Sequence, residues 1–179
     1  MMTTAASAQL TTPITNRDHI QGLDSAVVTL VRYGDYACPR CNEARFVVKQ
    51  LRAVLGDRLR YVFRNFPMST LYSRAHHAAE AAEAAGAQNK FWEMHDLLYD
   101  HQLALSDKHL RVYATQAGLD MERFNLDMML HTHAFRVHED ILSAGQSGVS
   151  AAPAFFINYR QHSGPFDLKT LLSHMEKFT

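Results

Sequence analysis

The sequence predicts an α/β fold in which a βαβ half and a ββα half are separated by a helical insertion. Three observations predict it: two apolar, β-branched runs flank a helical pattern, a long stretch without period-two alternation follows, and another apolar run precedes the last helical pattern. The 179 residues suit one domain of ordinary size, or a small domain with an insertion.

The first half is predicted from residues 27–64. Residues 27–33 are mostly apolar and β-branched, which is typical of a strand covered on both faces. Apolar residues recur at helical spacing over 38–55, and residues 59–64 form a second apolar run. Because a strand, helix, strand succession of this length needs a crossover connection, we expect the two strands to be parallel and the crossover right-handed.

The middle of the chain is predicted to be entirely helical. Ala-rich and amphipathic stretches follow one another with short breaks at Gly86, Ser106 and Gly118. Helices are predicted over residues 73–85, 90–101, 107–117, 120–130 and 132–146.

The second half begins after Gly148. Residues 154–158 are predicted to be a strand, residues 160–163 a short second one, and residues 167–177 a closing helix with Asp167 as its cap.

The same pattern predicts the domain organisation. Residues 18–66 and 148–179 together form one α/β domain, and residues 67–147 form an inserted helical domain. Residues 1–17 are rich in Thr, Ala and Ser without periodicity, so we expect a flexible N-terminal tail.

The charge balance excludes several classes of partner. Lys plus Arg and Asp plus Glu number 18 each, so the net field does not attract nucleic acid or an anionic membrane surface. No stretch approaches the ~20 apolar residues of a membrane span. Because the first fifteen residues have no basic start and no apolar run of ~7 to 15 residues, no secretory signal is predicted and we expect a cytoplasmic protein.

The chain has two cysteines, Cys38 and Cys41, in a C-x-x-C arrangement. Zinc sites use this spacing too, but a structural zinc site needs two further ligands and there is no second cysteine pair. Eleven histidines are scattered through the chain, and neither adjacent histidines nor histidines two apart share a helix face. For these reasons we expect no metal at the cysteines or at His76–His77, His131, His133 and His138.

A redox role accounts for more features of the pair. Pro39 is favourable in a first helical turn, so both cysteines are placed at a helix N-terminus, where unpaired N–H groups favour a thiolate. Cys38 is then the nucleophile, and Cys41, one turn later, is the resolving thiol. Arg40 adds a positive charge that we expect to stabilise the thiolate and to favour the reduced form.

Pro153 stands immediately before the apolar run 154–158. The residues alone leave two interpretations open, because a proline here can be an ordinary strand-entry residue or can follow a cis peptide bond near the cysteine helix.

Several separated segments together resemble the DsbA-like thioredoxin-fold thiol-disulfide oxidoreductases. The segments are residues 34–41, 63–67, 79–84, 91–95 and 148–158, and the resemblance extends over residues 18–178. It implies a thioredoxin-like fold with a helical insertion, a cis proline at Pro153 facing the cysteines, and a backbone contact from Ala152 to the substrate peptide. Pro39 and Arg40, between the cysteines, are expected to contact the substrate as well.

The chain departs from that family's pattern at three places. Arg32 stands six residues before Cys38, where relatives often carry an acidic residue that assists proton transfer, so a carboxylate shuttle is not expected there. Ala152 replaces the usual Thr or Val before the proline. Tyr159–Arg160 replaces a glycine after the strand, and the following turn is expected to differ.

Two further residues are secondary candidates. Asp35 either forms an ordinary Gly-Asp turn or influences the proton chemistry of Cys38. Trp92 is expected in a helix–helix core, with the edge of a substrate groove as the alternative.

The function expected from these observations is thiol-disulfide exchange with protein or peptide thiols. No cofactor is expected beyond the redox-active disulfide and an external thiol donor or acceptor, either glutathione or a thioredoxin-type reductant. Two alternatives stay open: a non-catalytic redox sensor or chaperone-like binder, and a glutathione-dependent isomerase or transferase on the same fold. The net direction in the cell, as oxidase, reductase or isomerase, does not follow from the sequence.

Overall fold

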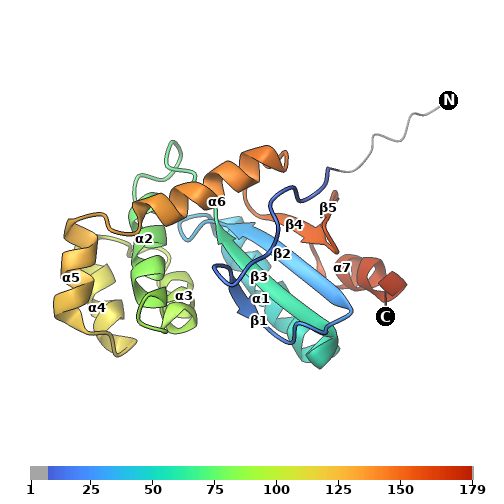
Figure 1. Cartoon of the computed structure of the whole chain (residues 1–179), viewed down its shortest axis with the longest axis horizontal. Helices are drawn as coiled ribbons and strands as arrows, with labels where there is room; N and C mark the ends of the chain where they lie inside the picture. Colours follow the sequence, from blue (N-terminus) through green and yellow to red (C-terminus); the bar gives the residue numbers. More distant parts are fainter. Residues whose placement is uncertain (1–7, 179) are drawn as a thin grey trace.

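The computed structural model describes residues 8–178. At its centre is a sheet with the strand order β1-β3-β2-β4-β5 (Figure 1). The strands are β1 His19–Gln21, β2 Val28–Gly34, β3 Leu59–Asn65, β4 Ala154–Ile157 and β5 Arg160–His162. β2 and β3 are parallel, with Val28 opposite Leu59, which confirms the predicted crossover unit. β4 runs antiparallel to both of its neighbours, β2 and β5.

The helices lie where their periodicity predicts them. Within the described residues they are α1 Pro39–Leu55, α2 Ala75–Gly86, α3 Phe91–Asp100, α4 Asp107–Gln116, α5 Met121–Met129, α6 Ala134–Gln146 and α7 Leu168–Met175. Short 3-10 turns follow α1 at Gly56–Arg58 and α7 at Glu176–Phe178. The side chain of Asp167 accepts the N–H of Thr170, as predicted for the cap of the last helix.

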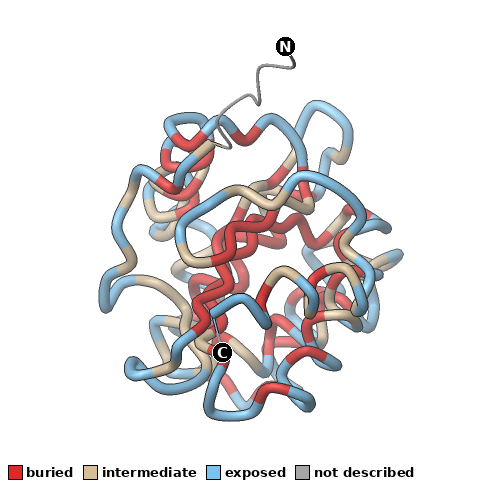
Figure 2. The backbone as a smooth tube through the Cα atoms, turned by 90° about the vertical axis from the view of Figure 1, so that its right-hand side faces the viewer, coloured by how far each residue is buried: buried red, intermediate tan, exposed pale blue. Residues whose placement is uncertain are grey.

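The sheet separates two apolar cores, because successive strand residues point to opposite faces. Leu30 belongs to the core that also contains Leu51 of α1 and Leu171 of α7. Val31 belongs to the smaller core on the other face, together with Ala144 of α6. Figure 2 shows the resulting buried strands running through the middle of the molecule. A continuous apolar run in β2 is therefore what a strand covered on both faces requires.

Residues 8–17 are ordered by the sheet, so the prediction of a tail through residue 17 is wrong for them. The N–H of Leu10 donates to the carbonyl of Tyr159 at 2.8 Å, and Gln9 bridges to Arg160 of the edge strand. Leu10 is 8% exposed and lies in the smaller core. Residues 1–7, which the same prediction covers, lie outside the described residues. The sequence also gave no sign of β1, which pairs antiparallel with β3.

The helices α2 to α6 lie between β3 and β4 in the chain and pack mainly on one another. α2 is at the middle of this block and contacts α3, α4, α5 and α6. α6 leaves the block and runs across one face of the sheet (Figure 1). Over residues 8–178, no helix combines the length and the apolar character needed to cross a membrane.

Candidate active site

Cys38 and Cys41 lie at the beginning of α1. Cys38 is the residue before the helix, with an extended backbone, and Pro39 is the first helical residue. No side chain caps this end, so the first N–H groups of the helix are available to the Cys38 sulfur. Both thiols are free, and the residues are only 4% and 0% exposed.

The two thiols differ strongly in acidity. The pKa of Cys38 is lowered from 9.0 to about 6, first by a hydrogen bond from the Cys41 thiol and then by the N–H groups of Cys41 and Arg40, although burial and the charge of Asp35 oppose the shift. Burial, followed by the hydrogen bond to Cys38, raises the pKa of Cys41, and Arg32 opposes this. At neutral pH, Cys38 is therefore mostly a thiolate and Cys41 a thiol.

The loop before β4 lies against Cys38. The Cys38 sulfur is 3.7 Å from the carbonyl oxygen of Ala152, and the Ala152–Pro153 peptide bond is cis. This resolves the two interpretations of Pro153 in favour of the cis form. The loop comes beside the cysteines because β4 pairs with β2, the strand that leads into the cysteine segment.

Asp35 holds the turn between β2 and α1. Its carboxylate accepts the N–H of Ala37 at 2.8 Å and the N–H of Met68 at 2.8 Å, and its own N–H donates to the Cys41 sulfur at 3.4 Å. Burial is the main reason why the pKa of Asp35 is raised. Both sequence interpretations of Asp35 therefore apply, because the residue forms the turn and its charge acts on Cys38.

Two residues near Cys38 were not predicted. The side-chain amide of Gln102 donates to the carbonyls of Tyr36 at 2.8 Å and Cys38 at 2.7 Å, so it fixes the cysteine loop. The phenol of Tyr72 faces Cys38, and its pKa is raised by desolvation and then by the charge of Cys38. Both residues come from loops of the helical block, and no local pattern in the sequence marks them.

Arg32 places a buried positive charge beside Cys41. The residue is 0% exposed, and its Nη2 donates to the carbonyl of Cys41 and to the hydroxyl of Tyr99. The guanidinium lies 5.6 Å from the ring centre of Phe63 and 5.2 Å from that of Tyr99. Within residues 8–178, its Nε and Nη1 have no hydrogen-bond partner of good geometry, and the groups that raise its pKa are Tyr99, Tyr61 and Cys41 rather than a carboxylate.

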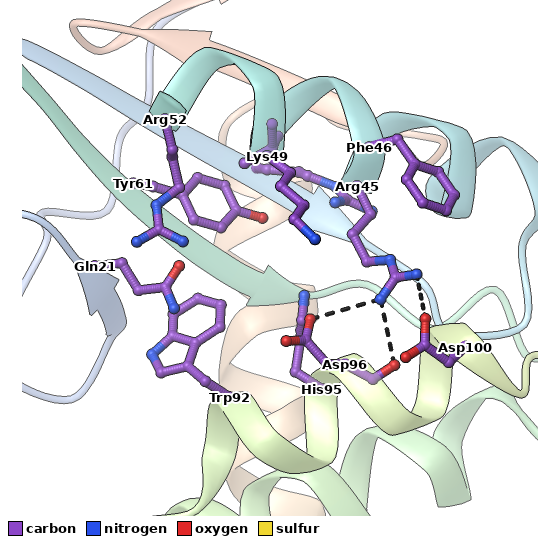
Figure 3. Close-up of a pocket in the computed structure, with 12 residues that line it drawn as sticks. Gln21, Arg45, Phe46, Lys49, Arg52, Tyr61, Trp92, His95, Asp96 and Asp100 are labelled. Atoms are coloured by element: carbon purple, nitrogen blue, oxygen red, sulfur yellow. Dashed lines mark hydrogen bonds and ion pairs between the residues drawn. The ribbon is translucent and has the colours of Figure 1, made fainter. Parts of the chain in front are cut away.

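A pocket of about 260 Å³ lies between α1 and α3, and Arg32 forms part of its lining (Figure 3). Figure 3 shows Arg45 directed toward Asp96 and Asp100 of α3, with N–O distances of 3.6 and 2.5 Å. Lys49 and Arg52 extend into the same space from α1 (Figure 3). Neither cysteine lines this pocket.

Arg40 lies near Cys38, and Trp92 packs against the main apolar core, as predicted for a core residue. The Arg40 guanidinium lies over the ring of Phe166, 5.3 Å from its centre, and Arg40 lowers the pKa of Cys38 through its backbone N–H. Trp92 packs against Tyr61, 5.8 Å between ring centres, and lines the pocket between α1 and α3. Trp92 thus lies in a helix–strand contact, away from the cysteines.

Two of the scattered histidines come together around a buried carboxylate. His77 and His131 place ligand atoms within 4.8 Å of one another and of Glu80. They belong to different segments, so the spacing of histidines within one helix does not prevent them from converging. Each pairs with a carboxylate: His131 with Glu80 at 2.9 Å and His77 with Asp107 at 3.0 Å.

The fold is that of several solved structures. BdbD from Bacillus subtilis has a TM-score of 0.84 at 22% identity, covering 97% of this chain and 97% of its own. The thiol-disulfide exchange protein alpha-DsbA2 from Wolbachia pipientis has a TM-score of 0.77 at 23% identity, covering 92% and 88%.

Curated relatives match the chain more closely, but only with part of their length. A Na(+)/H(+) antiporter NhaA 1 from Salinispora arenicola is 43% identical over 156 residues, which is 87% of this chain and 24% of the antiporter. One from Mycolicibacterium vanbaalenii is 40% identical over 163 residues, which is 90% of this chain and 26% of that protein. The chain therefore spans about a quarter of the length of these relatives.

The family model described as Thioredoxin matches residues 15–177, which include all strands of the described sheet and both cysteines. With the cysteines at the start of α1, the helical block between β3 and β4, and the loop of Pro153 beside Cys38, the chain belongs to the thioredoxin family and has its DsbA-like form.

Proposed function

We propose that this protein catalyses thiol-disulfide exchange on protein or peptide substrates, with Cys38 as the nucleophile and Cys41 as the resolving thiol. The observation that carries the proposal is the difference in acidity between two adjacent thiols: the pKa of Cys38 is lowered to about 6, whereas that of Cys41 is raised. A thiolate is the attacking and the leaving form in this chemistry, so the outer sulfur is ready to react and the inner one is held in reserve.

In the reducing direction, the Cys38 thiolate attacks one sulfur of a substrate disulfide. A mixed disulfide forms, and the other substrate sulfur leaves as a thiolate. Cys41 then loses its proton and attacks the Cys38 sulfur, which forms the Cys38–Cys41 disulfide and releases the second substrate thiolate. The two substrate sulfurs are reduced by two electrons and the cysteine pair is oxidised by two. The oxidising direction is the reverse sequence, started by a substrate thiolate that attacks Cys38 of the disulfide.

The surroundings of Cys38 support a peptide substrate. The carbonyl of Ala152, 3.7 Å from the sulfur, is an acceptor for a substrate N–H group. Leu71, next to Tyr72, is 70% exposed, and Leu103, next to Gln102, is fully exposed. These two exposed apolar side chains, next in the chain to residues that contact Cys38, are candidates for contacting the apolar residues of an unfolded substrate.

The lowered pKa of Cys38 also indicates which direction of thiol-disulfide exchange is favoured. A stabilised thiolate favours the reduced form of the pair and makes the disulfide more oxidising. We therefore propose a reduction potential above the ~−270 mV of thioredoxin. Equilibration with glutathione measures it, and a value at or below the thioredoxin range would favour a reductase.

The activity is tested with the purified protein in two assays: reduction of insulin by dithiothreitol, and oxidation of a reduced dithiol peptide. We expect Cys38→Ser to lose both rates and Cys41→Ser to accumulate mixed disulfides without turnover. Rates equal to those of Cys38→Ser would reject the proposal. Activity with glutathione that survives Cys41→Ser would indicate the glutathione-dependent alternative. Redox-dependent partner binding with negligible turnover would indicate the sensor.

The curated relatives favour a second candidate, in which the chain acts as a redox module on a Na(+)/H(+) antiporter. A purified NhaA antiporter in proteoliposomes would then change its transport rate when the oxidised chain, but not the Cys38→Ser variant, is added to the side that the module faces.

We also propose the cytoplasm as the location of the cysteines. Labelling of Cys38 in intact cells by a membrane-impermeant thiol reagent would contradict this location.

A further inference from the structure

The pocket between α1 and α3 has more positive than negative charge. Four cationic side chains line it: Arg32, Arg45, Lys49 and Arg52. Its two carboxylates, on Asp96 and Asp100, both pair with Arg45. Four cations against two carboxylates give this lining a net charge of +2, with the charge of Lys49 also acting on Asp96.

The deepest of these cations, Arg32, is stabilised by Tyr99, Tyr61 and Cys41, which raise its pKa despite its burial, and no carboxylate is among the groups that do so. Arg32 is 0% exposed, and its Nε and Nη1 have no hydrogen-bond partner of good geometry within the described residues, although the hydroxyl of Tyr61 lies close enough to interact with the guanidinium. A buried charge normally has an opposite charge nearby, because the protein interior solvates ions poorly. The aromatic rings of Phe63 and Tyr99 stabilise the guanidinium in part, but they supply no negative charge.

The exposed part of the pocket has the groups that an anion needs. Lys49 and Arg52 are exposed and stand one turn apart on α1, so both can reach the same ligand. The ring of Trp92 forms a flat apolar wall opposite them (Figure 3). At about 260 Å³, the cavity is large enough for a phosphate or dicarboxylate group.

We propose that this pocket binds a small dianionic oxyanion, held by Lys49 and Arg52, whose charge compensates that of the buried Arg32. The ligand has no direct path to the Arg32 nitrogens, which are covered, and acts on them through its charge. Because Arg32 also donates to the carbonyl of Cys41, the anion is coupled to the cysteine pair. Its negative charge disfavours the Cys38 thiolate, which is the charged group of the reduced pair, and so shifts the pair toward the disulfide.

Binding is tested with inorganic phosphate and with succinate at constant pH and ionic strength, and sodium chloride is the control. Trp92 is the only tryptophan of the chain, so its fluorescence reports directly on the pocket. We expect a saturable change with a dianion. Each of Lys49→Gln and Arg52→Gln should weaken binding roughly tenfold, since each removes one charge-assisted contact.

Lys108→Gln is the matched control, because Lys108 is exposed on α4 and does not line the pocket. A response that does not saturate, that chloride reproduces, or that Lys108→Gln weakens as much as Lys49→Gln would overturn the proposal. Saturation by acidic peptides but not by phosphate or succinate would also overturn it, and would identify the occupant as a segment of a partner protein.

The coupling between the bound anion and the cysteine pair rests on the proposed function, whereas the binding of the anion does not. The coupling is measured as the equilibrium between the cysteine pair and glutathione, with and without saturating phosphate. We expect saturating phosphate to shift this equilibrium toward the disulfide, because a negative charge opposes the thiolate of the reduced pair. Saturable binding without this shift refutes the coupling alone. A shift without catalytic turnover refutes the proposed function and leaves the site intact.

Discussion

Replacing Cys41 by alanine is expected to raise the pKa of Cys38, because the thiol of Cys41 is the largest of the influences that lower it. Serine at the same position keeps a short hydroxyl donor, so Cys41→Ser should leave the pKa of Cys38 much closer to its native value of about 6. The two variants differ by one polar atom in a buried site, and their comparison isolates the hydrogen bond from the N–H groups of the helix.

The size of the effect follows from the kind of bond. A hydrogen bond to a charged group contributes about 1.5–3 kcal/mol, and one pKa unit corresponds to ~1.36 kcal/mol. Cys41→Ala should therefore raise the pKa of Cys38 by about one to two units. With a native pKa of about 6, the thiolate fraction at pH 7 would fall from about nine-tenths to between about a half and a tenth.

The assay is the rate of alkylation of Cys38 by iodoacetamide as a function of pH, supported by the ultraviolet absorbance of the thiolate. The buried Cys41 contributes little to either signal, since its pKa is raised. A native midpoint near the ordinary value of 9.0 would refute the reasoning, and so would identical midpoints for the alanine and serine variants.

Four further predictions follow from the same structure. Because folding lowers the pKa of Cys38 from 9.0 to about 6, this thiolate stabilises the reduced protein fully above pH 9.0, and the stabilisation is lost as the pH falls through about 6. Urea unfolding of the reduced protein and of Cys38→Ser, compared across this pH range, measures the effect. Gln102→Ala should lower the free energy of unfolding by about 1–3 kcal/mol, since two carbonyls lose their donor, and unchanged urea midpoints would contradict this. Leu10→Ala should lower the free energy of unfolding in urea by about 2–4 kcal/mol, because Leu10 is buried, and the control Leu103→Ala should leave it nearly unchanged, because Leu103 is exposed. Equal effects of the two substitutions would mean that residues 8–17 are not part of the core. Asp35→Asn should move the alkylation midpoint of Cys38 below about 6, because it removes a negative charge, and a rise would show that the turn itself is disturbed.

The parts of the fold that could be predicted are those decided by local pattern. The apolar run of β2 requires a strand buried on both faces, and the helical spacing of α1 requires a helix buried on one face. The structure shows β2 and α1 buried in these ways. Residues 8–17 and β1 could not be predicted in this way. Their order depends on edges of the sheet that exist only after distant segments have paired, such as the contact of Leu10 with Tyr159.

The same distinction applies to the site. The spacing of Cys38 and Cys41 and the proline of the first turn are local, and they placed the pair at a helix N-terminus. Gln102 contacts a carbonyl 64 residues earlier in the chain, so no spacing could indicate it. The sequence identified Arg32 as an unusual residue at its position, but not the aromatic rings that enclose it or the pocket behind it.

Arg32 stabilises the thiolate of Cys41 in both directions of the proposed exchange. A guanidinium cannot accept a proton, and no carboxylate in residues 8–178 hydrogen-bonds the Cys41 sulfur, which instead accepts the N–H of Asp35. When Cys41 has to attack, the positive charge of Arg32 assists the loss of its proton, although burial keeps the pKa of the thiol high. When Cys41 leaves, the positive charge of Arg32 is already in place to stabilise the thiolate that forms. Attack and departure of Cys41 pass through the same transition state, so Arg32 assists both, and an anion in the pocket beside Arg32 would slow both.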